Sequence, residues 1–318
     1  MKTTVFLNTA KVNFDNRLDF SPITKLTALT NYAASSHEEI LARVKDQNIV
    51  ITKELPIGRD LITQFPPSVE LICEAGTGYN NIDIAAAKEK NIAVCNIPGY
   101  STAAVAQLAI TFMLSLSSSL ALQQIMIKQK NFDNFTKFLQ VPHFELQNKT
   151  LGVIGAGTIG QQVIKTALSL GMNILTYNRT PKAWGDQDIK TASLEELLKQ
   201  SDFVTIHCPL TAETKYLINK DTLKLMKSSA CIINTSRGPI IKETDLIEAL
   251  QKGHIAGAAL DVQDPEPPEP DNPLFAMNNV ILTPHIGWKC LESRQRLIKL
   301  LAANIEAFTQ GQPINVVS

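Results

Sequence analysis

The chain has 318 residues, of which 44% are hydrophobic and 19% charged, and 30 basic side chains balance 30 acidic ones. This length is too great for one ordinary core and suits two domains of about 150 residues each. A net charge of zero gives no general attraction to a polyanion, and aromatic residues make up only 6% of the chain. We therefore expect neither nucleic acid nor a membrane as a partner.

The first ten residues, MKTTVFLNTA, contain no apolar signal core. No later run reaches the roughly 18 uncharged apolar residues of a spanning helix. The most apolar stretch, residues 103–122, contains several polar residues and predicts one buried helix over 101–122. The five cysteines form no Cys-x-x-Cys pair, and the five histidines have no ligand spacing, so we expect a cytoplasmic protein without disulfides and without a bound metal.

Short β-branched runs alternate with helical patterns along the whole chain, which predicts an α/β protein with parallel sheets covered on both faces. Ser193 and Glu196 have the spacing of a capping box at the start of one helix. The expected strands are 4–8, 49–52, 70–73, 93–96, 150–154, 173–177, 203–207, 231–235, 257–261 and 280–283. The expected helices include 38–45, 59–64, 160–170, 193–200 and 243–252.

A dinucleotide-binding fingerprint begins near the middle of the chain. The sequence GAGTIG at residues 155–160 follows an apolar strand, precedes a helix, and is followed by a second strand about 20 residues on, as the motif requires. Gly155 and Gly160 serve the tight turn and the close helix–strand packing, and Gly157 lets the backbone approach a pyrophosphate held at the helix N-terminus. We expect Thr158 and Ile159 to contribute to the same cofactor site.

The central position of the fingerprint indicates how the domains are arranged. A dinucleotide-binding Rossmann domain at 101–287 interrupts a second α/β domain formed by residues 1–100 and 288–318. The last helix, expected at 291–310, returns to this second domain.

The residues after the second strand of the fingerprint unit bear on the choice of cofactor. In an NAD site this strand ends in Asp or Glu, which accepts hydrogen bonds from the ribose 2′-hydroxyl. Here Asn178, Arg179 and Thr180 occupy that place, and the first carboxylate is Asp186. Because Arg179 can pair with a 2′-phosphate that a carboxylate would repel, the pattern favours NADP(H). NAD(H) is the alternative if Arg179 is only a solvated surface residue.

Three polar residues follow successive strands of the nucleotide domain. Arg237, Glu266 and His285 each come just after an expected strand, at the edge where α/β sheets place their ligands. Such a set suits the interconversion of a 2-hydroxy acid and a 2-oxo acid. Arg237 presents a planar fork to the substrate carboxylate and carbonyl oxygen, His285 exchanges the proton, and Glu266 keeps the imidazole oriented and its charged form favoured.

Further motifs accompany these residues: GTGYNNID at 76–83, NIPGYST at 96–102, HCPLTAET at 207–214, NTSRG at 234–238, GAALDV at 257–262 and TPHIG at 283–287. Together with the fingerprint they resemble the D-isomer-specific 2-hydroxyacid dehydrogenase family over nearly the full length. The resemblance implies a flavodoxin-like substrate domain beside the Rossmann domain. It also implies catalytic roles for Arg237, Glu266 and His285, and a homodimer formed through the nucleotide domain.

The resemblance assigns roles to further residues. A glycine loop at Thr77, Gly78 and Tyr79 would hold the substrate carboxylate together with Arg237. The positions that would line the nicotinamide are Thr102, Thr235, Asp261, His285 and Gly287. The positions that would cover the pyrophosphate and adenosine are His207, Pro209 and Thr214. One departure is Gln263, where the family usually has Phe, which puts the packing of that loop in doubt.

The resemblance also narrows the substrate. Residues 100–102, 105–107 and 287–288 look most like those of glyoxylate/hydroxypyruvate reductases and glycerate dehydrogenases, so we expect a small 2-oxo acid as substrate. Tyr79 and Lys53 are candidates for setting substrate width. The alternatives are a D-lactate or branched 2-ketoacid dehydrogenase with a different pocket, and a corepressor-like NAD(P)-sensing scaffold without enzymatic activity.

Overall fold

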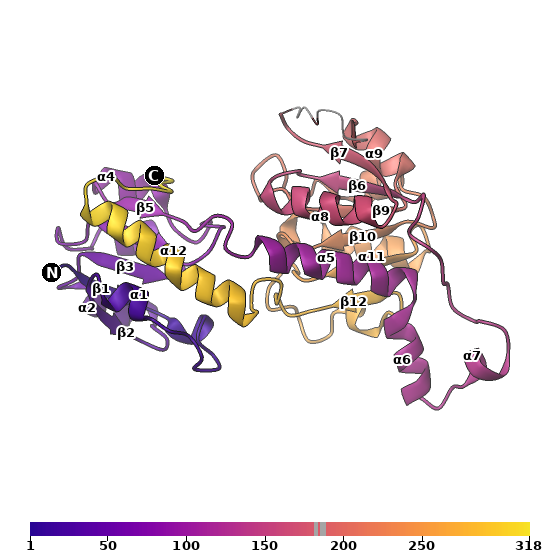
Figure 1. Ribbon diagram of the computed structural model, residues 1–318, viewed down its shortest axis with the longest axis horizontal. Helices are drawn as coiled ribbons and strands as arrows, with labels where there is room; N and C mark the ends of the chain where they lie inside the picture. Colours follow the sequence, from indigo (N-terminus) through magenta and orange to yellow (C-terminus); the bar gives the residue numbers. More distant parts are fainter. Residues whose placement is uncertain (181–183, 185–188) are drawn as a thin grey trace. The chain divides into compact units, whose positions relative to one another are not determined.

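The computed structural model describes residues 1–180, 184 and 189–318. The chain divides into two compact units, of which the first comprises Met1–Ser101 and Trp288–Ser318 and the second comprises Thr102–Gly287. Each unit contains its own parallel β-sheet with helices on both faces (Figure 1). The expected α/β class, with a Rossmann sheet inserted into a flavodoxin-like domain, is confirmed.

The sheet of the first unit has five parallel strands in the order β2-β1-β3-β4-β5. This is the flavodoxin-like doubly wound order, in which the direction of winding reverses between β1 and β3. The strands are β1 (Thr3–Phe6), β2 (Ala28–Asn31), β3 (Ile49–Thr52), β4 (Leu71–Glu74) and β5 (Ala93–Cys95). The helices are η1 (Thr9–Lys11), α1 (Ser21–Thr24), α2 (His37–Val44), α3 (Arg59–Ile62), α4 (Ile84–Glu89) and α12 (Leu291–Thr309).

The core of this unit lies on both faces of its sheet, because successive side chains of each strand point to opposite faces. On β3, Ile49 and Ile51 pack in the cluster that contains α12, whereas Val50 packs in the cluster that contains α2, α3 and α4. Successive side chains of a strand point to opposite faces, so a strand buried on both faces is apolar throughout. The helix formed by the last part of the chain is therefore an integral part of the first unit.

The sheet of the second unit has seven parallel strands in the order β12-β11-β10-β9-β6-β7-β8. Counted from β6, this is the Rossmann order with one strand added, and winding reverses between β6 and β9. The strands are β6 (Thr150–Ile154), β7 (Asn173–Tyr177), β8 (Ile189–Thr191), β9 (Phe203–Ile206), β10 (Cys231–Asn234), β11 (Gly257–Leu260) and β12 (Val280–Leu282). The helices are α5 (Thr102–Ser117), α6 (Leu120–Lys128), α7 (Asp133–Thr136), α8 (Thr158–Ser169), α9 (Leu194–Gln200), α10 (Lys220–Leu223), η2 (Gly238–Ile240), α11 (Glu243–Gln251) and η3 (Pro273–Ala276).

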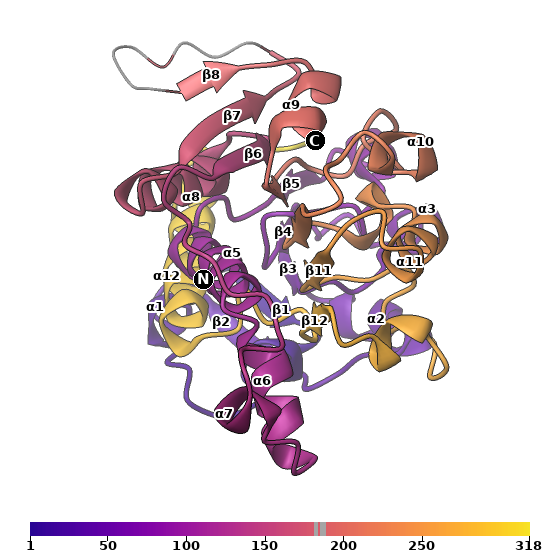
Figure 2. The ribbon, with the colours of Figure 1, turned by 90° about the vertical axis from the view of Figure 1, so that its right-hand side faces the viewer.

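The two faces of this sheet are also covered by different helices. Val153 and Ile233 pack with residues of α5 and α8, and Val204 and Ile232 pack with residues of α9 and α11. Figure 2 shows β8 at one edge of the sheet, next to β7. All ladders are parallel, so every strand ends at the same edge, and the loops at that edge come together whatever their separation in sequence.

The ten expected strands all correspond to observed strands, with ends that differ by no more than two residues. Two further strands, β2 and β8, were not predicted. Both lie at a sheet edge and carry mostly exposed or half-buried residues, so they lack the apolar pattern that identifies the central strands. The capping box is confirmed: Ser193 Oγ accepts from the Glu196 N–H at 3.2 Å, and a Glu196 carboxylate oxygen accepts from the Ser193 N–H at 2.9 Å.

The expectation of one buried helix over 101–122 is wrong. The segment forms α5 and α6, which are bent by 61° about a break in which Ser119 has a left-handed φ of 46°. Serine hydroxyls donate hydrogen bonds to backbone carbonyls at this break: Ser117 Oγ donates to Leu114 O, and Ser119 Oγ donates to Pro142 O. Such bonds compete with helical ones and end the helix. Only α5 is largely buried, whereas α6 contains no buried residue.

Among the described residues no single helix is long and apolar enough to cross a membrane, and α5 and α6 pass that test of length and composition only as a bent pair.

Candidate active site

Three neighbouring strands place the predicted catalytic residues at one edge of the second sheet. Arg237 follows β10, Glu266 follows β11 and His285 follows β12, and these strands are adjacent in the order β10-β11-β12. The loops that carry the three residues therefore leave the sheet side by side.

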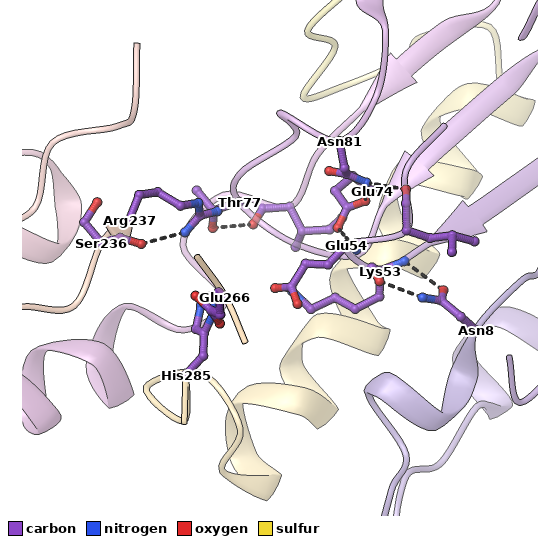
Figure 3. A network of polar contacts seen from close by, with 12 residues as sticks. Asn8, Lys53, Glu54, Glu74, Thr77, Asn81, Ser236, Arg237, Glu266 and His285 are labelled. Carbon is purple, nitrogen blue, oxygen red and sulfur yellow. Dashed lines mark hydrogen bonds and ion pairs between the residues drawn. The ribbon is translucent and has the colours of Figure 1, made fainter. Parts of the chain in front are cut away.

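Close backbone packing joins the first two loops. A Cβ placed on Gly238 would lie 1.8 Å from the carbonyl oxygen of Gln263. Only glycine permits this contact, which seats the turn carrying Arg237 directly on the loop leading to Glu266. Gln263 itself is buried, and its Nε2 donates to Leu260 O at 3.5 Å, so the unusual residue is accommodated inside the loop. The Arg237 guanidinium donates to Ser236 O at 2.8 Å (Figure 3).

The second and third loops are joined by the predicted acid–base pair. His285 Nδ1 lies 2.7 Å from Glu266 Oε1. Because an ionised carboxylate only accepts hydrogen bonds, the Nδ1–H is the donor, and Nε2 is the nitrogen that remains for chemistry. His285 has a left-handed φ of 50°, a conformation that non-glycine residues adopt at some energetic cost and that clusters at functional sites.

Asp261 holds the His285 loop in this conformation. Its Oδ1 accepts from Thr283 Oγ1 at 2.6 Å and from Ile286 N at 2.7 Å, and its Oδ2 accepts from Gly287 N at 2.8 Å. Burial raises the pKa of Asp261 above its ordinary value, and the three hydrogen bonds act against that rise. Both oxygens of this carboxylate thus bond to the loop that presents His285.

Glu243 holds the proline-rich loop at 261–273 and was not singled out from the sequence. Its carboxylate accepts from the Asp264 N–H at 3.2 Å and from Asn272 Nδ2 at 2.6 Å. An acidic residue in the first turn of α11 looks like an ordinary helix-start preference, so its position in the sequence does not reveal this contact.

The fingerprint glycines fit a dinucleotide. A Cβ on Gly160 would lie 2.3 Å from Gly155 O, and one on Gly155, which has a φ of 91°, would lie 2.5 Å from the backbone nitrogen of Cys208. A Cβ on Gly157 would meet nothing within 4 Å. The first two glycines are therefore required by packing, while Gly157 borders open space at the N-terminus of α8, where Thr158 and Ile159 begin the helix without a side-chain cap. Such an end binds phosphate.

The residues after β7 are those expected on the adenosine side of the site. Asn178 Oδ1 accepts from the Ala156 N–H at 2.6 Å, which ties this turn to the fingerprint loop. Arg179 and Thr180 are exposed. Hydrogen bonding from Thr211 is the main cause that lowers the pKa of Glu213, and the charge of Arg179 contributes to the same shift. Asp186, the first carboxylate after β7, lies outside the described residues.

The loop after β9 is held by its own hydrogen bonds. The Thr214 hydroxyl donates to Pro209 O at 2.7 Å and accepts from the Thr211 N–H at 2.7 Å. His207 Nε2 lies 2.9 Å from Thr205 Oγ1, and desolvation lowers the pKa of this histidine to about 4. A neutral His207 and a hydrogen-bonded Thr214 shape this loop. Neither side chain supplies positive charge for an anionic cofactor.

Two predicted nicotinamide contacts retain unused hydrogen-bonding capacity. The hydroxyls of Thr102 and Thr235 are buried and have no hydrogen-bond partner within the described chain. A buried polar atom without a partner is costly, and a bound group that supplies one removes that cost. These two hydroxyls, the uncapped start of α8 and the open space at Gly157 all fit a nicotinamide dinucleotide.

The predicted substrate loop lies in the first unit, directly after β4. The Ile97 N–H donates to Gly76 O at 2.8 Å, Thr77 Oγ1 donates to Ile97 O at 3.1 Å, and Asn96 Nδ2 donates to Thr77 O at 2.7 Å. Thr77 and Tyr79 are exposed, and Gly78 is half-buried. The loop is thus fixed at its base while its tip is accessible.

Within the described residues no group of three or more histidine, cysteine, aspartate or glutamate side chains could hold a metal ion.

Comparison with known proteins identifies the class of this fold and site. Residues 110–287 match the model of the D-isomer specific 2-hydroxyacid dehydrogenase NAD binding domain. A hydroxypyruvate reductase of Blautia hydrogenotrophica is 40% identical over 285 residues, which is 88% of each chain. A glyoxylate reductase of Thermococcus litoralis is 37% identical over 285 residues, which is 88% of this chain and 86% of that one. The solved structure of an acyclic imino acid reductase in complex with NADPH and D-Arg is also similar, with a TM-score of 0.89 and 27% sequence identity. The match covers 99% of this chain and 100% of that one.

The chain belongs to the D-isomer-specific 2-hydroxyacid dehydrogenase family. It is an oxidoreductase that acts on CH–OH donors and uses a nicotinamide cofactor.

The role of Asp261 leads to a stability prediction. In Asp261→Asn an amide NH₂ replaces one carboxylate oxygen and faces an N–H or O–H donor, so we expect the free energy of unfolding to fall by about 1–3 kcal/mol. Chemical denaturation measures this change. Asp271→Asn, at an exposed position, is the matched control and should stay within about 0.5 kcal/mol of the wild type. Equal stabilities of the two variants would contradict the anchoring role.

Proposed function

We propose that this protein is a reductase of small 2-oxo acids, with glyoxylate or hydroxypyruvate as its substrate and a D-hydroxy acid as the product where the product is chiral. The observation that carries the proposal is the 2.7 Å contact between His285 and Glu266, on the loops beside the one that carries Arg237. The similarity to a hydroxypyruvate reductase and a glyoxylate reductase supports the choice of substrate.

The residues divide the chemistry as follows. A bound nicotinamide supplies the hydride in the reductive direction. The Arg237 guanidinium pairs with the substrate carboxylate and polarises the ketone oxygen, for which its planar fork is suited. His285 donates the proton that the oxygen takes up, and Glu266 stabilises the imidazolium and keeps Nε2 directed outward. The backbone N–H groups at Thr77, Gly78 and Tyr79 bind the carboxylate.

Replacing the proton donor tests this assignment. We expect His285→Gln to lower kcat by about 10²–10⁴-fold, because the amide retains the size and polarity of the ring but cannot donate the proton. The affinity for reduced cofactor, measured by fluorescence titration, should change less than about threefold. Near-normal turnover by a correctly folded variant would refute the role of His285.

Turnover of a panel of 2-oxo acids separates the proposed function from its alternatives. Cofactor oxidation is followed at 340 nm with glyoxylate, hydroxypyruvate, pyruvate and branched 2-oxo acids. The largest kcat/KM for pyruvate or for a branched acid would instead define a D-lactate or branched 2-ketoacid dehydrogenase. Cofactor binding without turnover of any acid would favour a nucleotide-sensing scaffold.

NADP(H) is the proposed cofactor, and NAD(H) is the alternative. Support comes from the exposed Arg179 after β7, where no carboxylate occupies 178–180, and from the NADPH bound by a structural relative. The family model is described as NAD binding, so it does not separate the two cofactors.

A double substitution tests the cofactor proposal. Asn178→Asp with Arg179→Ile introduces a carboxylate that repels a 2′-phosphate and removes its cationic partner. We expect the ratio of kcat/KM for NADPH to that for NADH to fall at least tenfold. The single change Lys165→Ala, which removes an exposed positive charge from α8, should leave the ratio within about threefold. An unchanged ratio in the double variant would show that Arg179 does not select the cofactor.

We also propose a homodimer formed through the second unit. Helices α6 and α7 project away from that unit in both views (Figures 1 and 2). This arm is rich in exposed apolar side chains, which a second copy of the chain would cover. Within residues 120–139, which form this arm, they are Leu120, Ile125, Ile127, Phe132, Phe135, Phe138 and Leu139.

The oligomeric state follows from light scattering on a size-exclusion column. We expect a dimer for the wild type and a shift toward monomer when Phe135 and Phe138, which are 74% and 92% exposed, are both changed to Ser. Phe275→Ser removes another exposed phenylalanine of the same unit and should leave the dimer intact. A monomeric wild type would contradict the proposal.

The proposed location is the cytoplasm, since all five cysteines are free thiols, as in a reducing compartment. Thiol titration of acid-quenched cells would detect all five in the denatured protein. Disulfide-bonded protein would contradict this location.

A further inference from the structure

Lys53 occupies an unusual place for a charged side chain. It follows β3 directly, at the point where the winding of the first sheet reverses between β1 and β3. In open α/β sheets, ligands bind outside the carboxyl ends of the strands at such a switch point. Lys53 is only 2% exposed, although a lysine is almost never fully buried without a specific partner.

Three polar side chains hold the backbone around Lys53. Asn8, which is also buried, donates from Nδ2 to Lys53 O at 2.6 Å and accepts from the Lys53 N–H at 2.9 Å. Glu74 Oε1 accepts from the Glu54 N–H at 3.0 Å. Asn81 Nδ2 donates to Leu55 O at 2.8 Å and to Glu74 Oε2 at 2.9 Å (Figure 3). Glu54 has a left-handed φ of 53°, which this network maintains.

This network fixes the position of the Lys53 ammonium. Nζ lies 2.6 Å from Glu54 Oε1 and 4.1 Å from the centre of the Trp288 ring, which makes a cation–π contact. A Cβ built on Gly76 would lie 3.1 Å from the same Nζ and 3.2 Å from Glu74 Oε1. The ammonium therefore lies against the base of the loop that continues to Thr77, Gly78 and Tyr79.

The charges around the ammonium keep it protonated. Burial by itself would lower the pKa of Lys53, but its interactions with Tyr100, Glu54 and Glu74 hold it above the ordinary value. Burial raises the pKa of Glu74 to about 7, so this carboxyl is partly protonated near neutral pH. The ammonium is thus paired with the Glu54 carboxylate at 2.6 Å. Glu74 adds only partial negative charge near neutral pH, and the burial of Lys53 limits the screening of its charge by solvent.

We propose that Lys53 is a positioning and specificity residue for the substrate carboxylate: its buried ammonium, held against Gly76, makes the loop 76–79 selective for the ionised acid. The inference rests on the proposed function, in which this loop receives the carboxylate. Lys53 acts through the loop and through its electric field rather than by contact with the reacting atoms. Glu54 opposes this field, since its carboxylate partly neutralises the ammonium.

The test compares the best 2-oxo acid of the panel with its methyl ester, which lacks the negative charge. Lys53→Met should lower kcat/KM for the acid at least tenfold, which is about 1.4 kcal/mol, through a higher KM at nearly constant kcat. For the ester kcat/KM should change less than threefold. Glu54→Gln should shift the acid-to-ester ratio in the opposite direction, upward by about two- to fivefold. Lys88→Met, which removes an exposed charge from α4, is the matched control and should leave the ratio unchanged.

Two results would overturn the proposal. Equal losses for acid and ester in Lys53→Met would show that Lys53 only maintains the fold of the loop. If Lys53→Met does not fold, a lower or unchanged ratio in Glu54→Gln contradicts the proposal by itself.

Binding of the unreactive anion oxamate, measured by calorimetry with reduced cofactor present, separates this inference from the proposed function. A wild type that binds oxamate without reducing any 2-oxo acid would contradict the function alone. In that case at least tenfold weaker oxamate binding by Lys53→Met would support the role of Lys53, and unchanged binding would overturn it.

Discussion

The burial of both faces of two parallel sheets is the constraint on which the rest of this structure depends. A strand covered by helices on both sides has little room for charged side chains along its length, so charged groups concentrate where the strands end. Because all strands of a sheet run the same way, those ends share one edge. Arg237, Glu266 and His285 are separated by up to 48 positions along the chain, yet they leave β10, β11 and β12 next to one another.

Close backbone approaches then determine how the loops at that edge are seated. Gly160 lets α8 begin against Gly155, and Gly238 lets the Arg237 turn rest on the backbone of Gln263. A side chain at either place would push the loop away by the width of a methyl group or more. Gly157 has the opposite environment, with open space in front of it. The same residue type thus serves packing in two places and ligand access in the third.

Buried or half-buried carboxylates hold the loops that the glycines seat. Asp261 bonds to three donors of the His285 loop, and Glu243 bonds to two donors of the proline-rich loop before it. In the first unit Glu74 has the corresponding place, between the Glu54 backbone and Asn81. In both units, therefore, an acid at or near a strand end orients the loop that carries the proposed chemistry. Such preorganisation lets a polar site act without rearranging first.

The sequence by itself determined the class of fold, the central strands and the nucleotide fingerprint, and it placed Arg237, Glu266 and His285 after successive strands. Each of these has a local signature of apolar runs, glycine spacing or position after a strand. It did not reveal β2 and β8, whose edge positions leave them without an apolar pattern, or the break at Ser119, which depends on a hydroxyl reaching Pro142. Asp261 was predicted as a cofactor contact, and only the tertiary structure showed that both its oxygens bond to the His285 loop. Lys53 was only a candidate from the sequence. Its burial against Trp288 joins residues 235 positions apart, and contacts over such distances are made by folding and leave no local pattern to read.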